Sequence, residues 1–256
     1  VLEGLGIPLR FNPGPIFGDF VNRDNYKKYS NIEKAINHMS FQSKALQITR
    51  EQLSKSKSLI GFVGGPWTLL RFATNKNKKI IEIEDFHFTY LANVLLPLIK
   101  KNIKLQLESG AEIVMIFDSG LQDIDSKIYN SEYLLLIKNI AKSFPNKIGY
   151  YFKGKELKDI SNLFSDSLAG LGINHMIDIK KTFSSYKKGF IQGNFNENKM
   201  LLEEQQLRNE INIFCEEMQQ TNNLDGWICS LGHGINKSTP EKNVHIFIDI
   251  IRKKFS

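Results

Sequence analysis

Short apolar runs alternate with longer amphipathic stretches along the whole chain. The short runs have the length and composition of buried β-strands, and they are Ser58–Gly64, Glu112–Phe117, Lys147–Phe152, Asn174–Asp178, Gly189–Gln192 and Gly226–Ser230. The longer stretches predict helices at Ile32–Leu53, Glu84–Leu107, Ser131–Ser143, Glu156–Leu168, Lys181–Lys187, Lys199–Gln220 and Pro240–Lys254. This alternation predicts an α/β fold in which helices cover a parallel sheet. Pro97 is expected to kink or split the second helix, because proline removes a helical hydrogen bond.

Two parallel architectures fit this alternation, an open doubly wound sheet and a closed (β/α)8 TIM barrel. The open sheet usually carries a glycine-rich phosphate-binding turn, and neither GxGxxG nor GxxxxGK[ST] occurs in the chain. A barrel instead places polar residues at the carboxyl ends of many strands, as found at Gly64-Gly65, Asp118-Ser119, Lys153-Gly154, Gly193-Asn194 and Gly232-His233. The pattern favours the barrel.

Six strands are visible where a barrel needs eight. The final amphipathic helix closes the chain, so we expect the strands present to be three to eight and the other two to precede Val1. No linker rich in Pro, Gly or Ser divides the sequence, which favours one barrel domain over residues 1–256.

Composition and charge narrow the function classes. The 256 residues carry a net charge of +7, but the lysines are scattered, which favours an anionic small substrate over nucleic acid. No apolar run approaches the ~20 residues of a membrane span, and no signal peptide is visible. The two cysteines, Cys215 and Cys229, fit a reducing cytoplasm. Because no CxxC, HxC or HExxH motif occurs, we expect no metal site.

Several residues at strand ends are candidates for chemistry. His233 lies between Gly232 and Gly234, which let the backbone approach a ligand closely, whereas the other histidines are expected in helices or a strand as structural or exposed residues. Ser119 can donate its hydroxyl to a carboxylate, or alternatively cap the next helix. The phenylalanines expected near strand ends to line a pocket for a flat ring are Phe62, Phe72, Phe117 and Phe152.

Six motifs, in order from end to end, resemble those of the uroporphyrinogen decarboxylase family. Leu59–Leu69 resembles GFxGxPWTL, Gly110–Ser119 resembles GAdxxqiFDS, and Phe152-Lys153-Gly154 matches FxKG. The further segments are Gly172–Asp178, Gln192-Gly193-Asn194 (of QGNLDP, with Asn196-Glu197 in place of Asp-Pro) and Leu231–Val244 (of LGHGIxxxTPxENV). The resemblance implies a TIM barrel, usually a homodimer, without cofactor or metal. It also implies decarboxylation of the four acetates of uroporphyrinogen III to coproporphyrinogen III in porphyrin and heme biosynthesis.

The resemblance also assigns site residues. Ser119 occupies a substrate-binding hydroxyl position, His233 a histidine that binds a substrate carboxylate, and Phe72 stands where the family has a substrate-contacting tyrosine, with Arg71 beside it to compensate in part. The family's RQAGR and FSDI segments do not occur in the chain. No catalytic residue is therefore assigned within it, because the family aspartate is expected upstream of Val1. We expect Val1–Ser256 alone to aggregate and not to decarboxylate uroporphyrinogen.

Two other functions remain open. A cobamide- or thiol-dependent methyltransferase of the same superfamily would use a zinc-bound thiolate, built from a His-x-Cys pair and a distant Cys. That pair would fall near Tyr150–Lys153, which contains neither residue type, so two buried thiols are preferred for Cys215 and Cys229. A non-catalytic barrel that binds a tetrapyrrole is the second alternative.

Overall fold

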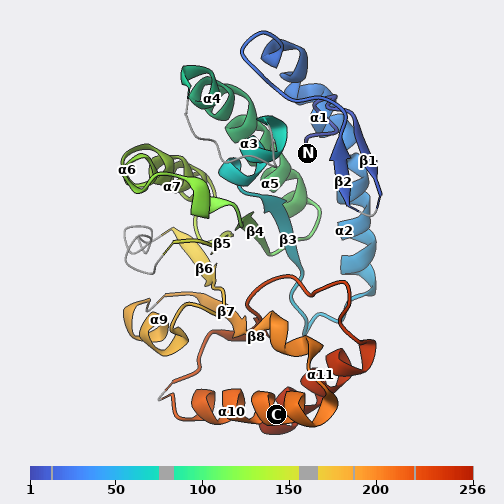
Figure 1. Ribbon diagram of the computed structural model, residues 1–256. Helices are drawn as coiled ribbons and strands as arrows, with labels where there is room; N and C mark the ends of the chain where they lie inside the picture. Colours follow the sequence, from blue (N-terminus) through green and yellow to red (C-terminus); the bar gives the residue numbers. More distant parts are fainter. Residues whose placement is uncertain (13, 75–83, 156–166, 187, 222, 256) are drawn as a thin grey trace. The chain divides into compact units, whose positions relative to one another are not determined.

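The computed structural model describes residues 1–12, 14–74, 84–155, 167–186, 188–221 and 223–255. The chain divides into two compact units (Figure 1). The described residues of the first unit fall within 1–155 and 167–168, and those of the second within 169–255. The single barrel domain over 1–256 stays a prediction.

The first unit begins with a small antiparallel hairpin and two helices. Strands β1 (Leu9–Phe11) and β2 (Pro15–Phe17) pair with each other. The single helix predicted over Ile32–Leu53 is two helices, α1 (Ile32–His38) and α2 (Ser40–Gln52). They meet at Met39, whose side chain is fully buried and whose sulfur accepts a hydrogen bond from Asn102 Nδ2 at 3.2 Å. The amphipathic pattern continues across this break, so periodicity alone did not reveal it.

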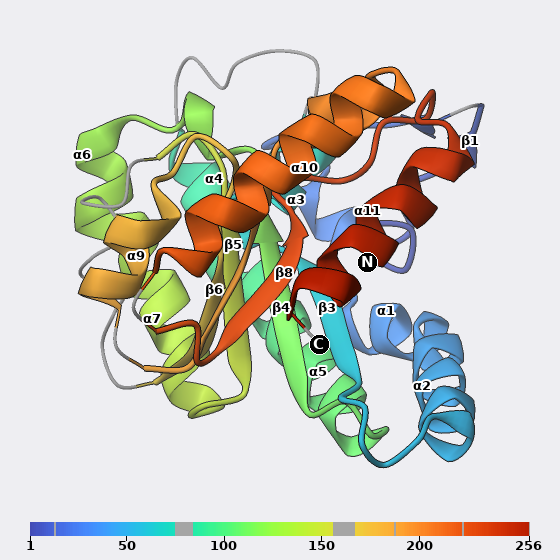
Figure 2. The ribbon, with the colours of Figure 1, turned by 90° about the horizontal axis from the view of Figure 1, so that it is seen from below.

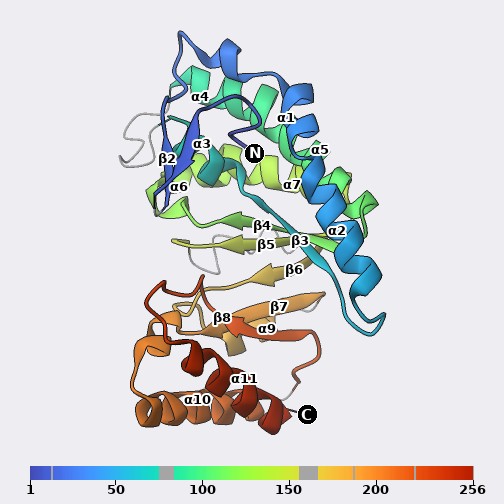
Figure 3. The same cartoon turned by 90° about the vertical axis from the view of Figure 1, so that its right-hand side faces the viewer.

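Three parallel strands form the sheet of the first unit. They are β3 (Ile60–Gly64), β4 (Ile113–Asp118) and β5 (Ile148–Phe152), and Figure 3 shows them side by side. The helices between and around them are α3 (Pro66–Thr74), α4 (Asp85–Tyr90), α5 (Leu96–Glu108), α6 (Ser126–Ile128) and α7 (Leu134–Ser143). Helix α5 packs on β3 and β4, and the buried Gln106 amide ties it to the sheet by bonding both the N–H and the carbonyl of Phe62, at 2.9 and 2.8 Å.

The helix predicted over Glu84–Leu107 is split near Pro97, as expected. Helix α4 passes into a π-helical turn, Leu91–Leu95, before α5 begins, and Pro97 lies in the first turn of α5. The N–H of Leu96 bonds the carbonyl of Leu91, five residues back. Proline has no N–H and its ring crowds the carbonyl four residues earlier, so a wider turn before it relieves the crowding.

The second unit also contains three parallel strands, β6 (Leu168–Gly172, whose first residue belongs to the first unit), β7 (Phe190–Phe195) and β8 (Trp227–Leu231). Its helices are α9 (Ile179–Ser185), α10 (Glu204–Gln219) and α11 (Glu241–Phe255). Figure 2 shows α10 and α11 lying alongside each other next to β8. The core between these elements consists of Phe195, Met200, Leu207, Ile211, Cys215, Ile246 and Phe247. Within the described residues, six parallel strands and intervening helices confirm the α/β class.

One strand prediction was wrong. Asn174–Asp178 forms a turn, and the strand lies earlier, at Leu168–Gly172. Two glycines made this run resemble a loop, but the ring of Phe190 lies where a Cβ at Gly170 would be, 2.4 Å from its nearest atom. The glycine is therefore required by packing inside the sheet. The predicted helix Glu156–Leu168 lies outside the described residues over 156–166, and Leu168 belongs to β6.

Candidate active site

Helix α3 is anchored to strand β4 at the carboxyl ends of β3 and β4. The first N–H groups of a helix have no partner within it, and here two of them find side chains of the first unit. The Thr68 N–H donates to Asp118 Oδ1 at 3.0 Å, and the Trp67 N–H donates to the Tyr133 hydroxyl at 3.1 Å. A carboxylate at a helix N-terminus also complements the helix dipole. These contacts set the position of every α3 side chain near the strand ends.

Asp118 is the centre of this anchor. Its carboxyl group is fully buried and accepts hydrogen bonds from the Thr68 N–H and hydroxyl on one oxygen, and from the Tyr133 and Tyr150 hydroxyls on the other. Burial raises the pKa of Asp118, while the four donors act in the opposite direction. A Cβ at Gly65 would lie 2.3 Å from Asp118 Cγ, so only glycine leaves room for the carboxyl group.

A pocket of about 220 Å³ opens beside this anchor within the first unit. Its lining residues come from α3 and from the end of β4, and they are Thr68, Arg71, Phe72, Ser119 and Gly120. The structure thus brings together Ser119 and Phe72, two of the three residues selected from the sequence. Phe72 packs on Phe17 of β2, with ring centroids 5.9 Å apart.

The other predicted phenylalanines lie elsewhere, which corrects the idea of a shared aromatic pocket. Phe152 is fully buried, whereas Phe62 and Phe117 are exposed on β3 and β4. The rings of Phe62 and Phe117 meet edge to face at 6.2 Å. Aromatic residues are frequent on strands because they pack well there. Their positions in the sequence therefore did not distinguish residues that pack in or on the sheet from residues that line a pocket.

The third candidate, His233, lies in the second unit just after β8 and is exposed. Its two flanking glycines have different roles. A Cβ at Gly232 would lie 2.5 Å from the backbone nitrogen of His175, and the Gly232 N–H donates to the Phe195 carbonyl at 2.7 Å. No atom lies within 4 Å of a Cβ built at Gly234. The close approach expected at these glycines is therefore found at Gly232, where the neighbouring atoms belong to the protein's own backbone. That His233 shares a cleft with Ser119 and Phe72 stays a prediction.

His175 was expected in a strand, and this was wrong because the segment is a turn. Its Nδ1 lies 2.9 Å from Oε2 of Glu197, and both side chains are largely buried. The turn is held by the Asn194 side-chain amide, which donates to the carbonyls of Asn174 and Ile177 at 3.1 and 2.7 Å. Sequence reasoning missed this pair because 22 residues separate its members. The one available signal was Glu197, an acid where the family motif has proline.

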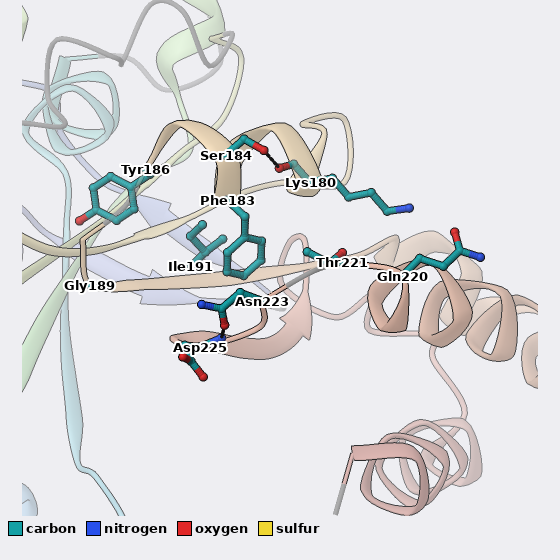
Figure 4. A pocket seen from close by; sticks show the side chains of 10 residues that line it. All are labelled: Lys180, Phe183, Ser184, Tyr186, Gly189, Ile191, Gln220, Thr221, Asn223 and Asp225. Atoms are coloured by element: carbon teal, nitrogen blue, oxygen red, sulfur yellow. Dashed lines mark hydrogen bonds between the residues drawn. The ribbon is translucent and has the colours of Figure 1, made fainter.

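A larger pocket, of about 440 Å³, lies in the second unit at the amino ends of β7 and β8 (Figure 4). Gly189 precedes β7 and Asp225 precedes β8, so this pocket faces the amino ends of the strands. Its marked hydrogen bonds, Ser184 Oγ to the Lys180 carbonyl and the Asp225 N–H to Asn223 Oδ1, are local to a helix and a turn. Barrel active sites lie at the carboxyl ends, which favours the pocket of Ser119 and Phe72.

In the part of the chain that the structure describes, no three His, Cys, Asp or Glu side chains gather in a way that could hold a metal ion. Nor is any helix in these ranges both long and apolar enough to cross a membrane.

The two cysteines are expected to be unreactive in the folded protein. Cys215 is fully buried in the core of the second unit, and Cys229 packs against that core. Burial raises the pKa of both thiols, that of Cys229 to about 12, so neither forms a thiolate near neutral pH. At about pH 8, Ellman's reagent should label neither thiol in native protein and both after unfolding in guanidinium. Rapid native labelling of either would contradict this and favour a thiolate-based methyltransferase.

The chain resembles known proteins over nearly its whole length. A family model described as uroporphyrinogen decarboxylase (URO-D) matches residues 1–254. The uroporphyrinogen decarboxylase of Orientia tsutsugamushi (strain Ikeda) is 29% identical over 99% of this chain and 77% of that protein. The one from Campylobacter jejuni is 27% identical over 97% and 76%. Among solved structures, a methyltransferase from Methanosarcina mazei matches with a TM-score of 0.81 at 16% identity, covering 100% of this chain and 77% of that one, a likeness of fold alone.

Proposed function

The chain belongs to the uroporphyrinogen decarboxylase family, and we propose that it removes the four acetate carboxyl groups of uroporphyrinogen III as CO2, giving coproporphyrinogen III in porphyrin and heme biosynthesis. The fold of the family is a (β/α)8 TIM barrel, of which this chain contains strands three to eight, β3 to β8, as the sequence predicted. The proposal makes the protein a carboxy-lyase that acts on an anionic tetrapyrrole.

The proposed reaction needs an electron sink and a way to orient carboxylates. Each acetate loses CO2 and its methylene carbon takes up one proton, which leaves a methyl group. A protonated pyrrole ring accepts the electron pair of the breaking C–C bond, and a fixed anion near the ring N–H groups stabilises that cation. In this proposal Ser119 donates its hydroxyl, and His233 its ring N–H, to substrate carboxylates. The net charge of +7 attracts the polyanion.

One observation carries this proposal. Ser119 and Phe72 are 47 positions apart in the numbering and were selected by separate motifs, yet they line one pocket at adjacent strand ends. Among the described residues, no hydrogen-bond partner occupies the Ser119 hydroxyl, which leaves it available to a ligand. A hydroxyl donor beside an aromatic wall suits a flat ring that carries carboxylates.

The test is anaerobic turnover of uroporphyrinogen III by the natural gene product, with any residues that precede Val1 or follow Ser256. Formation of coproporphyrinogen, detected by chromatography after oxidation to the porphyrin, is the expected result. Tight uroporphyrin binding without turnover would favour the non-catalytic tetrapyrrole-binding barrel instead. If the protein neither binds uroporphyrin nor turns over uroporphyrinogen, both the decarboxylase and the tetrapyrrole-binding barrel are ruled out.

Ser119→Ala is expected to lower kcat/KM for uroporphyrinogen about tenfold. The lost hydrogen bond to a charged carboxylate corresponds to roughly 1.5 kcal/mol. Ser131→Ala is the matched control, because Ser131 is exposed in the π-helical turn before α7 and does not line the pocket. Equal activity of both variants would remove Ser119 from the proposed substrate contacts.

The remaining expectations concern assembly and location. We propose a cytoplasmic homodimer without a resident cofactor, in line with the family resemblance. Sedimentation equilibrium of the natural protein tests the dimer, and a mass of about one chain per particle at micromolar concentration would contradict it.

A further inference from the structure

The pair His175 and Glu197 joins two segments that follow neighbouring strands of the second unit. The turn after β6 carries His175, and the segment after β7 carries Glu197. His175 Nδ1 lies 2.9 Å from Glu197 Oε2, and the two side chains are only 21% and 10% exposed. Among the residues that the structure describes, His175 is the one hydrogen-bonding partner of the Glu197 carboxylate. A carboxylate this far from water is costly unless it is paired, so the burial of Glu197 depends on His175.

Gly232, the residue after β8, is held by both of these segments. Its N–H donates at 2.7 Å to the carbonyl of Phe195, the last residue of β7. A Cβ at residue 232 would lie 2.5 Å from the backbone nitrogen of His175, so the Gly232 backbone rests directly on the turn after β6. Glu197 follows Phe195 by two residues. The contact between His175 and Glu197 therefore fixes, relative to each other, the two segments between which Gly232 is held.

The Asn194 side chain holds the same turn at two other points. Its amide donates to the carbonyls of Asn174 and Ile177, on either side of His175. These two hydrogen bonds remain when the contact to Glu197 is broken. Removal of the Glu197 carboxylate should therefore shift the turn and the Gly232 backbone that rests on it, without unfolding the second unit.

We propose that His175 and Glu197 are positioning residues for the loop Gly232–Gly234: their hydrogen bond fixes the turn that supports Gly232, and so determines where the loop meets the substrate. The loop follows the carboxyl end of β8, the end of the strands at which barrel enzymes build their active sites. The inference rests on the proposed function, which places this loop against a substrate carboxylate. It concerns the position of the loop backbone, whatever contacts the His233 ring makes.

The experiment compares the natural gene product with its E197A, E197Q and H175A/E197A variants in steady-state turnover of uroporphyrinogen. E197A should raise KM about 3- to 10-fold, the effect of one lost hydrogen bond, and leave kcat within about twofold. E197Q should stay within about twofold of the unaltered protein, because its amide oxygen still accepts a hydrogen bond from His175. The double variant should lose no more than E197A, since the two side chains act as one unit.

I211V is the control matched for stability. Ile211 is fully buried on α10 in the core of the second unit, and the loss of one methyl group there should lower the melting temperature by a few degrees without raising KM. A second readout follows the loop directly, through the Hε1–Cε1 NMR signal of His233, which H233Q assigns by its disappearance. This signal should shift in E197A and keep its position in E197Q and I211V.

The outcomes separate this inference from the proposed function. An E197A protein with unchanged KM and an unchanged His233 signal overturns the positioning role and leaves the decarboxylase proposal intact. Equal increases of KM in E197A and I211V at equal loss of melting temperature also overturn it, because the effect is then general destabilisation. So does a defect in E197Q as large as that in E197A. If the unaltered protein forms no coproporphyrinogen, the decarboxylase proposal fails, and the His233 signal alone decides whether the pair positions the loop.

Discussion

Asp118→Ala is expected to lower the free energy of unfolding by about 3–5 kcal/mol. The substitution leaves the buried Tyr133 and Tyr150 hydroxyls and the Thr68 N–H without their acceptor, and each unsatisfied buried donor costs about 1–3 kcal/mol, offset in part by relaxation. Asp118→Asn should cost less, since its amide oxygen can still accept from Thr68. Urea denaturation followed by circular dichroism measures the difference.

The control for Asp118 is Asp24→Ala. Asp24 is exposed in the same unit, and its replacement should change stability by less than about 0.5 kcal/mol. Because Asp118 anchors α3, its loss should also weaken uroporphyrin binding more than the Ser119 substitution does. An Asp118→Ala protein as stable as Asp24→Ala would show that the four hydrogen bonds contribute nothing net.

The pH dependence of stability provides a second measurement on Asp118. Burial raises the folded-state pKa above the ordinary value of 3.8, so between these two pKa values the folded state binds more protons than the unfolded state. The Asp118 contribution to stability is therefore greatest below pH 3.8 and declines as pH rises to the folded-state pKa. In Asp118→Asn this decline should be absent. A steeper decline in the variant would contradict the raised pKa.

Gly232→Ala is expected to destabilise the second unit and displace the His233 loop, whereas Gly234→Ala is expected to be tolerated. A Cβ at residue 232 would meet backbone atoms of Asn174 and His175, and backbone cannot rotate aside as a side chain can. Overpacking of this kind costs about 1–3 kcal/mol, and the upper end applies because the Gly232 N–H also bonds the Phe195 carbonyl.

Gly234 is the matched control for Gly232. A Cβ there meets no atom within 4 Å, and its φ lies outside the left-handed region, so alanine should be neutral or stabilise by up to about 1 kcal/mol through the unfolded state. Thermal melts of both variants, with uroporphyrin binding as the second readout, test the pair. Similar losses of stability in the Gly232→Ala and Gly234→Ala variants would mean that the loop depends on flexibility at either glycine rather than on close packing at Gly232.

The sequence was informative wherever a signal is local. The apolar runs Glu112–Phe117 and Gly226–Ser230 predicted the strands β4 (Ile113–Asp118) and β8 (Trp227–Leu231), because strands of a sheet covered by helices are mostly apolar. It failed at Leu168–Gly172, because the glycine that signals a turn is here required by the ring of Phe190 on the neighbouring strand. It also failed at Met39, where a break in the helix lies within an unbroken amphipathic pattern.

The residues of the candidate site likewise include some that local sequence patterns predicted and others that they did not. Motifs pointed to Ser119, Phe72 and His233. Ser119 and His233 lie just beyond the ends of β4 and β8, because short βα connections place such residues there regardless of distant contacts, whereas Phe72 lies on α3, the helix that follows β3. The role of Asp118 could not be predicted, since its partners Tyr133 and Tyr150 lie 15 and 32 residues away. The same holds for the pairing of His175 with Glu197 and for Arg71 entering the pocket over Gly120.

The sequence by itself thus determined the α/β class, the order of most elements, the family motifs and the residues at the strand ends. Only the tertiary structure decided which of these residues share a pocket, which glycine is needed for space and which charges are buried. Strand and helix patterns arise from interactions within a few residues, and those interactions are repeated along the chain. Hydrogen bonds to Asp118, the packing of Arg71 on Gly120 and the approach of His175 to Gly232 arise when separate elements meet, and no local pattern encodes them.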